Sequence, residues 1–166
     1  MSCRLAKATF MAMSITQRQV DLVCQSAAAV DSILEPFAEA FYAKLFTNHP
    51  GVRPMFSADP EVQAHKLAAE LRRIVGALRD PERFEKQVRT LGARHVRYGA
   101  QPGHYDAVGA VLLATFEEQL GEAFTPELYD AWAVAYATIA ALMIEAQQAA
   151  EAALELEELE AVAATA

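Results

Sequence analysis

Four histidines are the residues of this chain with the most evident chemistry, because the common catalytic motifs are absent. The sequence has no glycine-rich phosphate loop, no HExxH zinc motif and no nucleophile elbow. His49 lies in a proline-rich corner and is most simply a turn or surface residue, and His104 follows a Pro-Gly pair where an exposed or capping role is expected. His95 differs, because it continues an apolar stripe at helical spacing up to a structural break. By itself it is either a core histidine bonded to a carbonyl or the ligand of a bound group.

Three further polar side chains fall where a pocket could lie. Gln63 precedes Leu67 by four residues on the buried stripe of a predicted helix, so it faces inward, although a residue near a helix end can equally meet solvent. His65 lies about 200° around the helix from Leu67 and is expected to face outward. Tyr42 follows a phenylalanine, and its hydroxyl would need a partner if buried; simple core packing is the alternative.

The elements that must position these residues are predicted to be helices. Hydrophobic residues make up 54% of the 166 residues, Gly and Pro occur seven times each, and no alternating run of β-branched residues is found. The length suits one domain with a single core. We therefore predict an all-α protein, with helices over about residues 16–29, 32–46, 60–79, 81–95, 105–121 and from 126 onward.

Short-range signals mark the predicted helix starts. Ser32 and Glu35 have the spacing of a capping box. A capping residue followed by Pro begins three later helices, at residues 59–60, 80–81 and 125–126. These signals divide the chain into helices without indicating a linker between separate domains.

The charge is unevenly distributed along the chain. The formal net charge is −8, and six glutamates lie from residue 145 onward with no lysine or arginine among them. The remainder is nearly neutral, so neither nucleic acid nor an anionic membrane surface is an expected partner. Cys3 and Cys24 form no CxxC motif and are a poor disulfide framework, which favours reduced thiols and a cytoplasmic location. No apolar run of secretory or membrane-spanning length is evident.

Three segments are expected along the chain. Residues 1–13 lack a periodic apolar face and are predicted to be a flexible extension, residues 14–150 form the folded domain, and residues 151–166 form an acidic tail that is helical or disordered. Three leucines among the tail glutamates do not establish a sustained heptad, so monomer and homodimer both stay open.

Several stretches, in order, resemble one known family. "FYAKLFTNHPGVRPMF", "QAHKL", "RHVRYG", "HYDAVG" and "AWAVAYATIA" are similar to the haem domain of bacterial flavohaemoglobins and to the single-domain bacterial haemoglobins, over about residues 14–147. The resemblance implies a globin fold, with helices packed around a haem. Because the sequence has no CxxCH motif, the expected cofactor is a b-type haem held without covalent bonds.

The resemblance also implies roles for individual residues. His95 matches the proximal ligand of the haem iron. Phe56 matches the corner phenylalanine that packs on the haem, and Leu67 matches an apolar residue that closes the pocket. Tyr42 and Gln63 match the distal pair that hydrogen-bonds the bound gas. If the corner before Gln63 aligned differently, His65 could enter the pocket and bind the iron, which its helical phase opposes.

One proximal position departs from the family pattern. Tyr105 matches a tyrosine that, in flavohaemoglobins, joins a glutamate in a network hydrogen-bonded to the proximal histidine, so it is a predicted haem-site residue. Here the position of that glutamate holds Gln147, and Glu145 lies two residues earlier. A neutral amide polarises an imidazole less than a carboxylate does, which argues against strongly activated oxygen chemistry.

These implications favour a protein that binds O2 reversibly and tightly, for storage or transport, with NO and CO as further ligands. The alternative is nitric oxide dioxygenation, which would need an external reductase, because flavohaemoglobins continue into reductase domains that this sequence does not include. A haem-free, globin-like interaction module is a third interpretation, in which the acidic tail would bind the partner. His95, Tyr42 and Gln63 argue against the third, since a haem-free core has no evident use for all of them.

Overall fold

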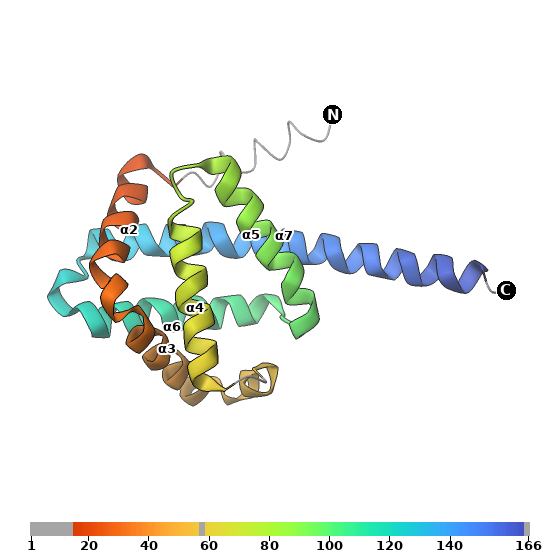
Figure 1. Ribbon diagram of the computed structural model, residues 1–166, viewed down its shortest axis with the longest axis horizontal. Helices are drawn as coiled ribbons and strands as arrows, with labels where there is room; N and C mark the ends of the chain where they lie inside the picture. Colours follow the sequence, from red (N-terminus) through yellow and green to blue (C-terminus); the bar gives the residue numbers. More distant parts are fainter. Residues whose placement is uncertain (1–14, 57–58, 165–166) are drawn as a thin grey trace.

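The computed structural model describes residues 15–56 and 59–164, and within them the chain is helical with no strand. The all-α prediction is therefore confirmed for this part of the chain, whereas the predicted N-terminal extension, residues 1–13, lies outside it. Figure 1 shows the helices crossing one another in a compact body from which the last helix projects. The helices are α2 (Gln17–Val30), α3 (Leu34–Asn48), α4 (Pro60–Val75), α5 (Pro81–His95), α6 (Pro102–Leu120) and α7 (Pro126–Ala164), with short 3-10 turns η1 (Asp31–Ile33), η2 (Pro50–Met55), η3 (Val96–Tyr98) and η4 (Gly121–Ala123).

Most predicted helix starts have the expected caps. The Asp59 side chain accepts the backbone N–H of Glu61 at 2.9 Å before α4. Asp80 accepts the N–H of Arg83 at 3.1 Å before α5. These carboxylates satisfy donors that have no partner within the helix, so each fixes the point at which its helix begins.

The predicted capping box at Ser32 is wrong. Residues 31–33 form the η1 turn, α3 begins at Leu34, and its N-cap residue makes no side-chain hydrogen bond. Glu35 binds the Arg72 guanidinium of α4 instead, with Oε1 at 3.0 Å from Nη1. The Glu35 side chain therefore forms an ion pair with another helix and does not complete the capping box at Ser32.

The predicted end of α4 is also wrong by a few residues. The helix ends at Val75, and the chain then turns from Gly76, a poor helix former, toward Asp80. Ala77 and Leu78 are still buried in this turn, which explains why the apolar periodicity continues past the helix. Burial alone cannot distinguish a last helical turn from an apolar connection.

The last helix is much longer than the body it packs against. α7 has 39 residues and continues without a break through the acidic segment, so residues 151–164 are helical and expose Leu154, Leu156 and Leu159. Figure 1 shows this end projecting from the body. α7 is also the helix, among those described, that is long and apolar enough to cross a membrane, and 39% of its apolar window is buried inside the protein. Its buried residues Leu128 and Trp132 serve the protein core.

Among the described glycines, Gly92 marks the closest approach between two backbones, where α5 crosses α7. A Cβ atom built on Gly92 would lie 2.4 Å from the Met143 carbonyl oxygen and 2.6 Å from its Cα. Met143 is itself buried, and the contacting atoms are main chain, so they cannot rotate away. Only glycine at position 92 therefore permits this crossing. Gly92 lies less than one turn before His95 on α5.

We expect Gly92→Ala to lower the free energy of unfolding by about 2 kcal/mol or more, because overpacking a close backbone contact costs that much even when the helix itself gains from alanine. Gly103→Ala is the matched control, since a Cβ there meets nothing within 4 Å. Thermal unfolding of both variants checks this. Equal midpoints for the two variants would contradict the close packing.

Candidate haem site

The proximal side of the site is built by the last turn of α5. His95 is the final residue of that helix, is partly buried, and its Nδ1 lies 2.8 Å from the Leu91 carbonyl oxygen. A carbonyl oxygen only accepts, so Nδ1 carries the proton and Nε2 keeps its lone pair. Burial lowers the pKa of His95, which favours the neutral imidazole. These are the properties that an imidazole needs to bind iron through Nε2.

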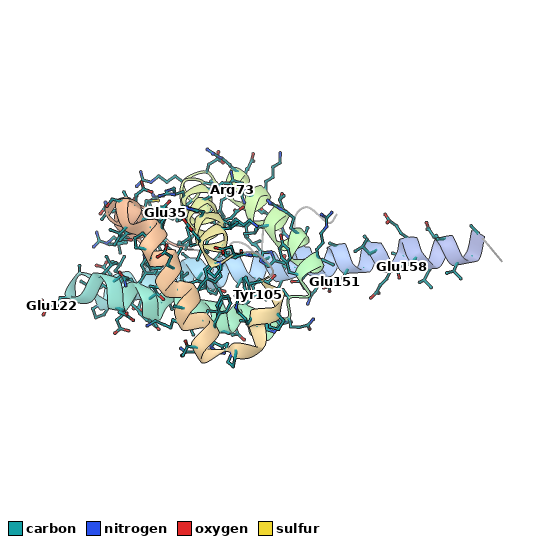
Figure 2. The ribbon with its side chains drawn as sticks, turned by 60° about the horizontal axis from the view of Figure 1, so that its bottom comes forward. Glu35, Arg73, Tyr105, Glu122, Glu151 and Glu158 are labelled. Atoms are coloured by element: carbon teal, nitrogen blue, oxygen red, sulfur yellow. The ribbon has the colours of Figure 1, made fainter. Side chains whose placement is uncertain are left out.

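A buried hydrogen-bond network lies next to this imidazole. The Tyr105 hydroxyl donates to Gln147 Oε1 at 2.8 Å, and the rings of Tyr105 and His95 are 6.1 Å apart between centroids. Gln147 Nε2 donates to the Ala100 carbonyl at 2.6 Å and to Glu151 Oε1 at 2.9 Å. Figure 2 shows Tyr105 in the body and Glu151 near the point where α7 leaves it. Tyr105 and residue 147 are therefore paired, but neither hydrogen-bonds the His95 ring directly.

Glu145, the other acidic residue near this position, belongs to the surface. Its carboxylate accepts from Arg89 Nη2 at 3.0 Å, and its side chain is 48% exposed. Arg89 also binds Glu85 on its own helix. Glu145 thus links α5 to α7 from outside and does not supply the missing proximal carboxylate.

The distal side has a buried tyrosine within an aromatic cluster. The Tyr42 ring contacts those of Phe46 and Phe56, with centroids 5.6 Å and 5.4 Å away, and Arg53 stacks over Phe46. Tyr42 is 8% exposed, and burial raises the pKa of its hydroxyl to about 12. No hydrogen bond joins this hydroxyl to another described residue, yet no described side-chain polar atom is both fully enclosed and unpaired. The hydroxyl oxygen is therefore not fully enclosed, and a water-sized molecule can reach it.

The α4 residues lie as their helical phase predicts. Gln63 and Leu67 are partly buried, and His65 is exposed. Leu67 packs against the hydrophobic core. The Gln63 side chain makes no hydrogen bond to another described residue, so its amide is available to a ligand. His65 points away from the core, and the interpretation of it as an iron ligand gains no support.

The remaining histidines have structural roles. His104 Nδ1 accepts the backbone N–H of Gln101 at 3.0 Å at the start of α6, which is the capping role expected from the sequence. His49 directly follows α3, in the corner before η2. Sequence reasoning had not anticipated the hydrogen bond from Gln147 to the Ala100 carbonyl, because it joins residues 47 positions apart.

The donor set fits a haem better than a bare metal ion. Among residues 15–56 and 59–164 no cluster of three or more His, Cys, Asp or Glu could hold an ion. A single neutral imidazole suffices where a porphyrin already supplies four nitrogens to the iron. The aromatic side chains around Tyr42 and its unpaired hydroxyl suit a pocket for a small polar molecule beside the porphyrin. An all-α fold with these parts defines a haem-binding protein of the globin class.

The globin family model matches residues 39–143, and the chain belongs to that family. The globin fold predicted from the sequence is confirmed, and haem is its cofactor. Among solved structures, the chain is similar to a bacterial globin from Campylobacter jejuni, with a TM-score of 0.71, 26% identity, and coverage of 80% of this chain and 96% of that one. It is also similar to an engineered carbene transferase from Rhodothermus marinus, provisionally assigned as a nitric oxide dioxygenase, with a TM-score of 0.78, 28% identity, and coverage of 86% and 99%.

The chain is also similar to curated relatives, some of which are much longer than the matched region. A flavohemoprotein of Deinococcus radiodurans is 34% identical over 78% of this chain and 33% of its own length. An anaerobic nitrite reductase of Oryza sativa is 30% identical over 80% of this chain and 96% of its own. The chain thus spans about a third of the flavohemoproteins that it matches.

We expect Tyr42 to stay a phenol well above the pH at which free tyrosine ionises, because burial raises its pKa to about 12. A raised pKa for an acid means that its contribution to stability is complete below about pH 10 and is lost as the pH rises toward 12. The measurement is the near-ultraviolet phenolate absorbance of the CO-bound ferrous protein, compared with Tyr42→Phe. The variant should lose the share of one tyrosine from the late part of the titration only, because burial also raises the pKa of Tyr105 and Tyr136. Loss of early absorbance would mean that Tyr42 is not buried.

Proposed function

We propose that this globin binds O2 reversibly and with high affinity, with His95 as the protein ligand of the iron and Tyr42 and Gln63 as hydrogen-bond donors to the bound gas. The observation that carries the proposal is the Tyr42 hydroxyl, which belongs to a buried side chain, has no protein partner among the described residues and can be reached by a small molecule. A hydroxyl among aromatic rings has few water molecules as partners, so a ligand that accepts its hydrogen bond is favoured. A polar diatomic gas is such a ligand.

The strength of the distal donors determines which gas is favoured. Haem would supply an iron to which O2, NO or CO can bind. Bound O2 carries partial negative charge, and a hydrogen bond to a charged acceptor contributes about 1.5–3 kcal/mol, or about ten- to a hundredfold in affinity for each donor. CO gains less charge and benefits less. The aromatic rings around Tyr42 reduce the competition from water, which strengthens such a bond.

Nitric oxide dioxygenation is the second candidate, and the matches to flavohemoproteins favour it. The same distal donors would orient the gas. Any such activity needs electrons to return the iron to its ferrous state, and within this proposal a separate reductase supplies them. Within this proposal the protein works in the cytoplasm, as a monomer or homodimer.

We expect the purified chain to take up one haem and to give a five-coordinate ferrous spectrum that converts to a stable O2 complex, whereas His95→Ala binds haem weakly. Tyr42→Phe should release O2 about tenfold faster while changing CO release much less. Tyr129→Phe is the matched control, because Tyr129 is 42% exposed on α7. Ultraviolet-visible spectra and stopped-flow ligand release measure these outcomes.

Different failures of this experiment have different meanings. No stoichiometric haem uptake would overturn the gas-binding proposal in favour of an interaction module. A six-coordinate ferrous spectrum would bring His65 or another side chain to the iron. Equal effects on O2 and CO in Tyr42→Phe would remove Tyr42 as a donor. Sustained nitrate formation from NO with a reductase, beyond a single turnover, would favour the dioxygenase, because a single turnover is common to oxygenated globins.

A further inference from the structure

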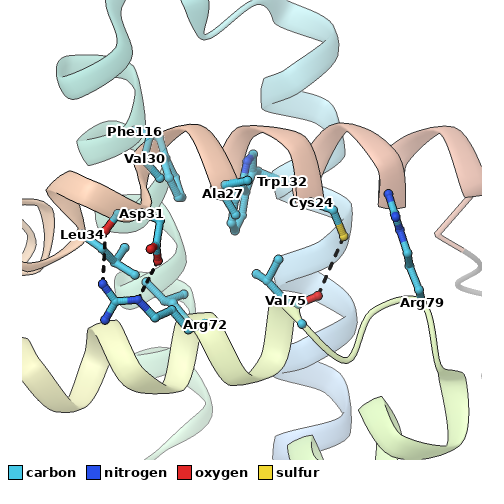
Figure 3. Close-up of a pocket in the computed structure, with 13 residues that line it drawn as sticks. Cys24, Ala27, Val30, Asp31, Leu34, Arg72, Val75, Arg79, Phe116 and Trp132 are labelled. Carbon is cyan, nitrogen blue, oxygen red and sulfur yellow. Dashed lines mark hydrogen bonds and ion pairs between the residues drawn. The ribbon is translucent and has the colours of Figure 1, made fainter.

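A cavity lies between α2 and α4, away from the proposed haem site (Figure 3). Its volume is about 340 Å³, and none of the six predicted haem-site residues lines it. Residues of α6 and α7 form its floor, where Phe116 and Trp132 lie with ring centroids 4.3 Å apart. Pockets for small organic ligands span roughly 300–1,000 Å³, so this one is of a suitable size.

The walls of the cavity are apolar and fixed. Val30, Leu71 and Val75 line it together with the small side chain of Ala27, which leaves room beside α2. The Trp132 indole N–H donates to Ser26 Oγ at 3.0 Å, so the ring is held in place and its polar atom is already satisfied. The middle of the cavity therefore offers apolar contact without competing hydrogen bonds, which suits the flat or branched apolar part of a ligand.

Two arginines lie toward opposite ends of the cavity, and they differ in how far they are neutralised (Figure 3). Arg72 is saturated, because it donates to the Asp31 carboxylate at 2.6 Å, to the Asp31 carbonyl at 3.1 Å and to Glu35 at 3.0 Å. Arg79 donates from Nη2 to Asp21 Oδ1 at 2.9 Å, its guanidinium also interacts with the Cys24 thiol, and its side chain is 60% exposed. A guanidinium has five N–H donors, so Arg79 keeps most of its donors for an anion.

We propose that the α2–α4 cavity binds a small organic carboxylate, with its apolar body between α2 and α4 over Trp132 and its carboxylate on Arg79. Arg79 would bind the carboxylate while still paired with Asp21, since an exposed ion pair contributes little and can be shared. The Cys24 thiol, 3.8 Å from the Val75 carbonyl, lies at the same end and adds no charge that would repel the ligand. Nothing in this proposal depends on which gas the haem binds.

The test uses the full haem-loaded chain in its diamagnetic, CO-bound ferrous form, with 2-naphthoate as the probe. The sequence contains one tryptophan, so the Trp132 indole N–H gives a single NMR signal located at the cavity. We expect a saturable shift of that signal with a Kd of about 1 mM or lower, the range typical of a ligand of this size. The neutral analogue 2-naphthamide should bind about two- to fivefold more weakly.

Arg79→Gln should weaken 2-naphthoate by about the same two- to fivefold and leave 2-naphthamide unchanged. Arg18→Gln is the matched control, because Arg18 is an exposed α2 arginine paired with Glu127 and does not line the cavity. Ala27→Leu, which fills the cavity, should abolish the shift while the CO spectrum confirms a folded, haem-loaded protein.

Three outcomes would overturn the proposal. One is no saturable Trp132 shift up to the solubility limit of the probe. Another is equal binding of the acid and the amide, which would remove Arg79 from the site. The last is a shift of the haem absorption bands without a shift of Trp132, which would place the probe in the haem pocket. Each of these outcomes is compatible with confirmed gas binding. The carboxylate-binding proposal can therefore be overturned without overturning the gas-binding proposal.

Discussion

The backbone contact between α5 and α7 is the constraint on which the haem site depends. Because Gly92 has no side chain, α5 lies directly on the main chain at Met143. His95 follows on the same helix, and Gln147 follows Met143 by one turn on α7. This one helix crossing therefore sets the positions of both the His95 imidazole and the Gln147 amide, which binds Tyr105 and the Ala100 carbonyl. A wider crossing would separate the two halves of the proximal side together.

Sequence reasoning was most successful where the physics is local. The carboxylates of Asp59 and Asp80 cap helices within three residues of themselves, and no distant group competes for them. It failed at Glu35, because Arg72, on another helix, offers a charged partner that outweighs a weak cap. The chain gives no sign of this in advance, since the two residues are 37 positions apart.

The predictions for the candidate site divide in the same way, into those that follow from local periodicity and those that do not. The helical period alone distinguished the inward phase of Gln63 from the outward phase of His65, because both lie in a regular helix. The roles of Tyr42 and Tyr105 could be inferred only by resemblance, since a buried tyrosine in a sequence is compatible with ordinary packing. The α2–α4 cavity had no signal in the sequence. Arg79 reaches it from the turn after α4, a segment whose conformation periodicity misassigned as helix.

The proximal network supports the proposal of reversible gas binding over that of oxidative chemistry. The Gln147 amide nitrogen donates to the Ala100 carbonyl and to Glu151, which turns its oxygen toward Tyr105 and makes the tyrosine hydroxyl a donor to it. The Tyr105 hydroxyl therefore donates to Gln147 and not to His95. The His95 Nδ1–H donates to a neutral backbone carbonyl. A neutral acceptor attracts the imidazole proton less than a carboxylate would, so the imidazole would donate less electron density to a haem iron. The Gln147 amide lies between Tyr105 and the Glu151 carboxylate, so the negative charge stays away from Tyr105. This arrangement favours holding a gas over cleaving it.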